Sequence, residues 1–274
     1  MIDNTIEIII VGITSILTGI ISVILGIGGG IILVPLFNIL VGLPIKMAIG
    51  TTKFLILFNS ASSVIAQYRY RRIDWKVGIL LLMTIIPGSI LGANLVQILD
   101  PKTLKTILGI ALIITSLNMM RRRKRSKNEI IRNGIWPRKI LTKDGKIFEY
   151  SFTLNRLIAG VALGFTSGLI AGITGLGGGI VNVPLTNLVL KMPIHISTAT
   201  SSFMIMVCAI PTVMVHSTLG HIDYIKGIIA VPGLIIGGQL GGKIVGGIKA
   251  ESLKTMFAIA VLIVAIKMIY DTLM

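Results

Sequence analysis

Two stretches of apolar sequence contain nearly the same glycine-rich motif followed by a proline. Residues 26–36 read GIGGGIILVPL, and residues 175–185 read GLGGGIVNVPL. Each glycine weakens a helix by about 1 kcal/mol relative to alanine, and proline removes a backbone donor, so both motifs predict interrupted helices. Free N–H groups at the start of a helix bind anions. The motifs therefore predict the wall of an anion site; the alternative is that the glycines only let helices pack closely.

Hydroxyl-bearing side chains follow each motif after a further proline. They lie in the stretches AIGTTKF at 48–54 and STATSSF at 197–203. A single serine or threonine often bonds only its own helix backbone, but two matched groups beside two interrupted helices offer donors that suit an oxyanion. The predicted substrate-binding residues are Gly26, Gly28, Gly29, Gly30, Pro35, Asn38, Thr51, Thr52, Lys53, Gly175, Gly177, Gly178, Gly179, Asn182, Pro184, Asn187, Thr200, Ser201 and Ser202.

Lys53 is the one cation in these hydroxyl-rich stretches. It lies about 12 Å from the start of its apolar segment, at a helical rise of 1.5 Å per residue. A cation inside a membrane is costly, so it either faces a cavity or partner, or extends along the helix to the interface. In the first case Lys53 would be the counter-charge of an anionic substrate. The site would then be asymmetric, because Ser202 occupies the equivalent position of the second stretch.

The sequence lacks the motifs of nucleotide binding, metal binding and catalysis. A dinucleotide fingerprint requires glycine at its sixth position, where this chain has Ile31 and Ile180. There is no H-E-x-x-H motif, GFTSG at 164–168 has no placed histidine base, and the histidines lack metal-ligand spacing. We therefore expect no catalytic residues, no metal and no cofactor.

Three further residues have simpler expected roles. Asp74 and Asp223 follow apolar segments and should cap the next helices, with proton coupling as the weaker alternative. Cys208 is the only cysteine, so it cannot form an intrachain disulfide. Its apolar surroundings predict a small buried hydrophobic residue.

The composition is that of an all-α integral membrane protein. The 274 residues are 54% hydrophobic and 13% charged, whereas soluble domains are about 25% charged. No charged residue occurs between Glu7 and Lys46 or between Arg156 and Lys191, and a span needs about 20 apolar residues. The N-terminal stretch lacks a basic n-region, so we interpret it as the first span rather than a signal peptide. We expect a multi-pass protein of the cell membrane.

The glycine motifs belong to a longer internal repeat. An offset of 149 positions takes Gly28 to Gly177 and aligns many residues between about 18 and 119 with the second half. This predicts a first membrane repeat at 1–120, a basic cytoplasmic linker at 121–152 and a second repeat at 153–274. The expected apolar segments are 6–25, 27–43, 45–68, 76–98 and 103–120, then 154–174, 176–191, 194–217, 225–246 and 252–271. The second segment of each repeat is short, which predicts broken or re-entrant helices.

Charge placement predicts the topology. The formal net charge of +16 is concentrated in the linker and in turns such as 69–76 and 243–254, which marks them as cytoplasmic. The turn at 218–225 lacks these cations and should lie on the other side. Five crossings per repeat would make the repeats inverted, whereas four would make them parallel. We prefer the inverted arrangement and expect residues 121–146 to contact anionic lipid headgroups rather than nucleic acid.

The paired motifs resemble those of the TauE/SafE family of membrane permeases, also called the sulfite exporter or TSUP family. The residues that carry the resemblance are the two glycine–proline motifs and the GTT and ATSS stretches that follow them. The resemblance extends over the chain except for the linker. It implies transport of small, often sulfur-containing anions such as sulfite, thiosulfate or sulfonates. Lys53 departs from the small residue usual at its position, and the linker is longer and more basic than expected.

These observations together predict a secondary transporter for a small anion. The substrate would bind near the membrane midplane, and rocking of the two repeats would expose it to alternate sides. Transport could be coupled to H⁺ or Na⁺. The alternatives are a passive anion channel, which also uses backbone dipoles and basic rings, and a structural membrane protein. The sequence does not determine the oligomeric state.

Overall fold

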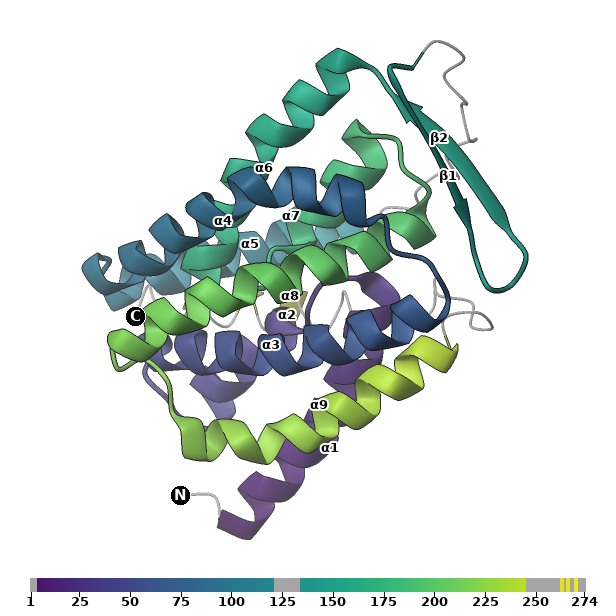
Figure 1. Ribbon diagram of the computed structural model, residues 1–274. Helices are drawn as coiled ribbons and strands as arrows, with labels where there is room; N and C mark the ends of the chain where they lie inside the picture. Colours follow the sequence, from purple (N-terminus) through teal and green to yellow (C-terminus); the bar gives the residue numbers. More distant parts are fainter. Residues whose placement is uncertain (1–3, 121–133, 245–261, 264, 267–268, 271–274) are drawn as a thin grey trace.

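A computed structural model describes residues 4–120, 134–244, 262–263, 265–266 and 269–270, and these residues are mostly helical (Figure 1). The predicted segment 252–271 and the turn 243–254 lie largely outside the described residues. The helices are α1 (Asn4–Leu25), α2 (Gly30–Pro35), the π-helix η1 (Leu36–Leu40), α3 (Ile45–Arg69), α4 (Trp75–Ile98), α5 (Pro101–Met120), α6 (Leu154–Thr174), α7 (Gly179–Pro184), the π-helix η2 (Leu185–Val189), α8 (Ile194–Thr218) and α9 (Tyr224–Ile244).

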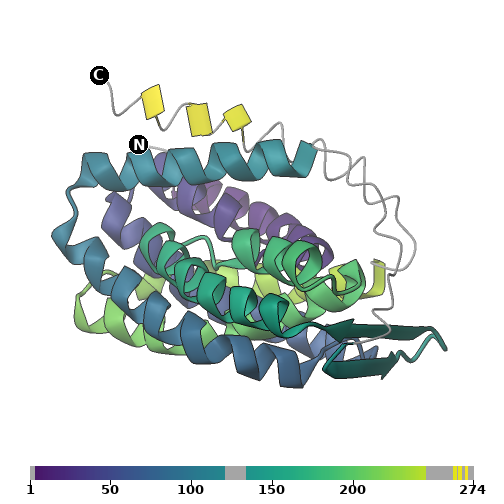
Figure 2. The same ribbon diagram turned by 90° about the horizontal axis from the view of Figure 1, so that it is seen from above.

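Five of the described helices, namely α3, α4, α6, α8 and α9, are long and apolar enough to cross a membrane. Three shorter apolar stretches, Ile10–Leu25, Gly30–Leu40 and Gly179–Val189, accompany them. Helix α5 lies along one side of the bundle (Figure 2), where its leucines join the core cluster of Ile27, Ile31 and Ile49.

The long helices pack in pairs through glycine. Helix α1 packs against α9, and α4 packs against α6. A Cβ on Gly19 would lie 2.7 Å from the carbonyl oxygen of Leu234, and one on Gly168 would lie 2.9 Å from the amide nitrogen of Ser89. These glycines allow the close backbone contact that stabilises helices in a membrane.

Helices α3 and α8 pack against each other in the middle of the bundle and run in opposite directions (Figure 1). Thr51 lies near the start of α3, and its Oγ1 accepts a hydrogen bond from the backbone of Asp223, just beyond α8 (2.9 Å). Thr200 lies near the start of α8, and its Oγ1 accepts from the backbone of Asp74, just beyond α3 (3.0 Å). The start of each helix is therefore attached to the turn that follows the other.

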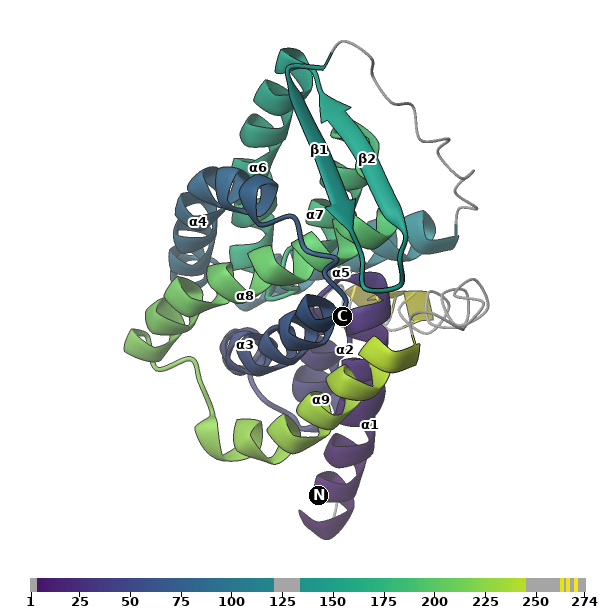
Figure 3. The ribbon, with the colours of Figure 1, turned by 45° about the vertical axis from the view of Figure 1, so that its right-hand side comes forward.

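A β-hairpin lies within the predicted linker, for which the sequence predicted only a basic loop. Strands β1 (Trp136–Leu141) and β2 (Ile147–Phe152) pair antiparallel, with Trp136 opposite Phe152. Partly buried and exposed side chains alternate along β1, and Gly145 in the connecting turn has a φ of 73°. Figure 3 shows the hairpin beside the turn between α3 and α4, where the backbone of Lys143 donates to the carbonyl of Tyr70 (3.1 Å).

Candidate functional site: two glycine loops between antiparallel helices

The two glycine motifs form matching loops, which we call the first glycine loop (26–30) and the second glycine loop (175–179). The first joins α1 to α2, and the second joins α6 to α7. Three glycines of each loop have positive φ angles, between 67° and 83° at Gly26, Gly28 and Gly29 and between 70° and 81° at Gly175, Gly177 and Gly178. Residues with a Cβ rarely adopt this conformation, so the backbone itself requires glycine there.

The remaining glycine of each loop lies where the two loops touch. A Cβ on Gly30 would lie 2.5 Å from the carbonyl oxygen of Gly175 and 2.7 Å from Cα of Leu176. A Cβ on Gly179 would overlap the backbone of Gly26 and Ile27. The starts of the short helices α2 and α7 are thereby brought together, although their motifs are far apart in sequence.

The loops lie against the middle of α3 and α8. A Cβ on Gly28 would lie 3.1 Å from the side chain of Ile205, and one on Gly177 would lie 3.3 Å from that of Ile56. Both isoleucines are buried and belong to one apolar cluster. Apolar side chains from the two antiparallel helices thus pack against the contact between the loops.

The predicted hydroxyl residues have different hydrogen-bond partners. Thr51 and Thr200 accept bonds from the turns described above, so their oxygens are engaged. Ser201 donates to the carbonyl of Gly26 (2.9 Å), and Ser202 donates to its own helix (3.2 Å). Thr52 is fully buried, and its Oγ1 has no hydrogen-bond partner among the described residues. It is therefore the hydroxyl of this group that the described residues leave without a hydrogen bond.

The predicted asparagines are already hydrogen-bonded within their own halves of the chain. Asn38 and Asn187 donate to the carbonyls of Leu43 (2.9 Å) and Met192 (2.8 Å), which closes the turns after η1 and η2. Asn182 accepts from Ser167 (2.6 Å). The two prolines, Pro35 and Pro184, lie where the α-helices α2 and α7 continue as the π-helices η1 and η2.

Asn59, which is not among the predicted binding residues, lies beside the first glycine loop. Its Nδ2 donates to Oγ of Ser22 (2.7 Å) and to the carbonyl of Gly28 (3.0 Å), while its buried Oδ1 has no partner among the described residues. Helical spacing was the available signal, because Thr52, Ile56 and Asn59 recur on one face of a helix.

Lys53 is covered by protein, with 2% of its residue surface exposed. None of the described carboxylates forms an ion pair with it. Cys208 and His216 of α8 are near enough to interact with it electrostatically, and Nε2 of buried His216 has no hydrogen-bond partner among the described residues. Cys208 is buried, as predicted. The second ring nitrogen of His216, Nδ1, lies 3.4 Å from Nδ1 of His221, at the turn after α8.

The sequence comparisons indicate what kind of protein has this arrangement. A model of the family described as "Sulfite exporter TauE/SafE" matches residues 11–268. The chain belongs to the sulfite exporter TauE/SafE family. The prediction of a multi-pass membrane protein is therefore confirmed, and the family is one of transporters rather than enzymes.

Relatives of the chain across bacteria and archaea are described in the same terms. "Probable membrane transporter protein YunE" of Bacillus subtilis is 27% identical over 96% of this chain and 97% of its own length. "Probable membrane transporter protein MJ0441" of Methanocaldococcus jannaschii is 28% identical over 88% of each chain. No solved structure matches this TauE/SafE chain.

Asp74 and Asp223 of this TauE/SafE protein cap α4 and α9, as predicted, by accepting from the backbone of Val77 (3.2 Å) and Lys226 (3.0 Å). The Asp74 carboxylate also accepts two hydrogen bonds from Arg138 (2.8 and 2.7 Å) and one from the hydroxyl of Tyr150 (2.6 Å). We call this group, Asp74 with Arg138 and Tyr150, the hairpin clamp.

The electrostatics of the hairpin clamp favour a fixed charge state. The carboxylate of Asp74 raises the pKa of Arg138. Burial, and then the charge of Asp74, raise the pKa of Tyr150 above its usual range. The guanidinium therefore stays charged and the phenol stays protonated, so both keep donating to the carboxylate.

Proposed function

We propose that this protein is a secondary transporter of a small sulfur-containing anion, such as sulfite, thiosulfate or a sulfonate, and that Lys53 supplies its counter-charge. The observation that carries the proposal is the burial of Lys53 in a membrane-spanning helix without an ion-pair partner among the described residues. An isolated buried charge is costly, so such a residue marks a functional site, and an anionic substrate would offset that cost.

Unsatisfied polar groups on α3 and α8 favour an oxyanion as the ligand. Thr52, the residue before Lys53, has a buried hydroxyl without a hydrogen-bond partner among the described residues, and His216 has a ring nitrogen without one. A sulfur oxyanion offers several acceptor oxygens, and hydrogen bonds between charged groups are stronger than neutral ones. The predicted glycine loops would complete the site, with backbone N–H groups at the starts of α2 and α7 as further donors.

The arrangement of the elements supports two inverted repeats, 1–120 and 153–274. An offset of 149 takes the bounds of α2 onto those of α7 and the bounds of α3 onto those of α8. The contacts repeat with the same offset, because the hydrogen bond from Asp223 to Thr51 matches the one from Asp74 to Thr200. Helices α3 and α8 run in opposite directions, as inverted repeats require. We infer alternating access by movement of one repeat against the other, with H⁺ or Na⁺ as the coupling ion.

Reconstitution into proteoliposomes tests the proposal. We expect saturable uptake of thiosulfate or sulfite that depends on an ion gradient. Currents of single-channel size would instead identify a passive anion channel, and no flux of any sulfur oxyanion or sulfonate would refute the substrate class.

Lys53→Gln tests the role of the charge, with Lys46→Gln as the matched control. Lys46 lies on the same helix, but its ammonium bonds the carbonyl of Gln97 in an exposed position (2.7 Å). A hydrogen bond to a charged group is worth about 1.5–3 kcal/mol, so KM should rise roughly 10- to 100-fold in Lys53→Gln. Equal KM values in the two variants would exclude Lys53 from the site while leaving the transport activity itself established.

A further inference from the structure

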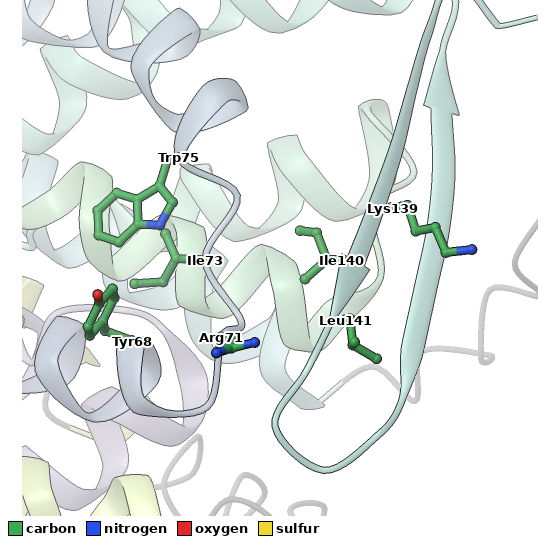
Figure 4. A pocket seen from close by; sticks show the side chains of 7 residues that line it. All are labelled: Tyr68, Arg71, Ile73, Trp75, Lys139, Ile140 and Leu141. Atoms are coloured by element: carbon green, nitrogen blue, oxygen red, sulfur yellow. The ribbon is translucent and has the colours of Figure 1, made fainter.

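A groove of about 230 Å³ lies between the β-hairpin and the turn that joins α3 to α4 (Figure 4). The aromatic rings of Tyr68 and Trp75 line it on the helix side, with their centroids 6.2 Å apart. Ile140 and Leu141 line it on the hairpin side, and Arg71 lies between the two sides. The groove thus combines an apolar lining with one guanidinium group.

The connection between α3 and α4, together with the adjoining helix ends, carries positive charge that no described carboxylate neutralises. Arg69, Arg71 and Lys76 are exposed, and none of them forms an ion pair with a described carboxylate. The neighbouring Arg72 is neutralised, because it pairs with Asp144 (2.7 Å). Lys139 also borders the groove, but its ammonium points away from it (Figure 4) and pairs with Glu149 (2.9 Å). Arg71 is therefore the cation that a ligand in the groove would meet.

The groove opens at the ends of two membrane-spanning helices. Helix α3 ends at Arg69, and α4 begins at Trp75. Tyr68 is 64% exposed and Trp75 is 38% exposed, and tyrosine and tryptophan are enriched where helices leave the membrane. Ile65 and Ile79, about one helical turn deeper, are exposed apolar residues that continue this surface toward the membrane interior.

We propose that this groove binds the phosphate group of an anionic membrane phospholipid. The guanidinium of Arg71 offers paired donors with the geometry of a phosphate, and the tyrosine hydroxyl and the indole N–H are further donors at the groove. Free phosphate has the same headgroup chemistry. A lipid fits better because its acyl chains would cover the apolar surface of Ile65 and Ile79, which a free ion leaves exposed to solvent or detergent.

A lipid in this position would contact both the helix turn and the hairpin. It would touch Tyr68 and Trp75 on the helix side and Ile140 on the hairpin side. A ligand that binds only when the hairpin lies against the turn between α3 and α4 stabilises that arrangement by mass action. Binding should therefore raise the temperature of thermal unfolding of the whole protein.

Thermal unfolding in detergent, with added lipid, tests this proposal without any measurement of transport. Phosphatidylglycerol should raise the unfolding temperature of the wild type, while phosphatidylcholine at the same concentration should not, because its choline cation offsets the phosphate charge that Arg71 would meet. In Arg71→Gln most of the shift should be lost, and in Arg71→Lys, which keeps the charge, part of it should remain. Arg69→Gln is the matched control, because it removes the same charge from the same turn but does not line the groove.

Each outcome bears directly on the proposal. An equal loss of the shift in Arg69→Gln and Arg71→Gln would indicate general attraction by surface charge and overturn it. An equal shift with phosphatidylcholine would overturn it too, as would a full shift with inorganic phosphate or glycerol phosphate alone, which would assign the groove to a soluble anion. Brominated phosphatidylglycerol gives a second measurement. It should quench the tryptophan fluorescence of the wild type more strongly than that of Trp75→Phe. Equal quenching of the two proteins would refute occupancy of the groove.

Discussion

The hairpin clamp makes a quantitative prediction for Arg138→Met. Arg138 donates two of the hydrogen bonds to the Asp74 carboxylate, whose side chain is fully buried, while the side chain of Arg138 is 17% exposed. The substitution keeps an apolar stem of similar length but removes both donors and the positive charge. The carboxylate would then keep the bonds from Tyr150 and Val77 but lose its counter-charge.

The magnitude follows from the burial of the pair. Breaking a buried ion pair by removing one partner costs about 3–5 kcal/mol, because the other charge stays uncompensated. Undocking of the hairpin would hydrate Asp74, so the cost should appear mainly as opening of this region. At 1.4 kcal/mol for each factor of ten, the open population should rise roughly 10²- to 4 × 10³-fold. Tyr150→Phe removes one hydrogen bond to a charged group and should cost about 1.5–3 kcal/mol.

Hydrogen–deuterium exchange of peptides from the hairpin measures this opening directly. Lys139→Met is the matched control, because Lys139 is the next residue of the same strand and its ion pair with Glu149 is exposed (65% and 46% of the two side chains). Such exposed pairs contribute about 0–1 kcal/mol, so exchange should hardly change. Adding Asp74→Asn to Arg138→Met should restore part of the protection. Similar exchange rates in Arg138→Met and Lys139→Met would refute the reasoning.

Three further predictions concern the core and the turn after α8. Gly28→Ala should lower the unfolding temperature, because alanine at a φ of 79° costs about 1–2 kcal/mol, whereas Gly12→Ala, in a helix with open space around it, should not. Thr200→Val should cost about 1 kcal/mol of stability by removing the acceptor for the Asp74 amide, with no loss expected for exposed Thr166→Val. Burial, and then Lys46, lower the pKa of His221, so stability should fall as the pH drops below about 6.5, and less so in His221→Gln.

Local sequence was a good guide to features that depend on neighbouring residues. The positive φ angles of the glycine loops and the caps at Asp74 and Asp223 involve residues within a few positions of each other. The hairpin also had a local signal, the Asp144–Gly145 pair in the turn between the two paired strands. It was missed because the high positive charge of the linker was interpreted as that of a cytoplasmic loop.

Other features could not be derived from neighbouring residues. Asn59 was not selected, because its helical spacing from Thr52 indicates a shared face of α3 but not the glycine loop that this face contacts. The asparagines Asn38 and Asn187 were selected for a ligand, but their amides close the turns of their own halves. Whether an asparagine amide binds a ligand here depends on whether the fold places an unsatisfied backbone carbonyl beside it.

Composition and motifs are enough to establish that the chain is a membrane protein and that its two motifs interrupt helices, because uncharged length and glycine content act locally. The packing of the helices determined that Lys53 is covered by protein rather than extended to the surface. It also decided that Asp74 meets Arg138, 64 positions away, and that Thr51 meets Asp223, 172 positions away. Such contacts depend on how the helices pack against one another, and residue types within one segment do not specify that packing.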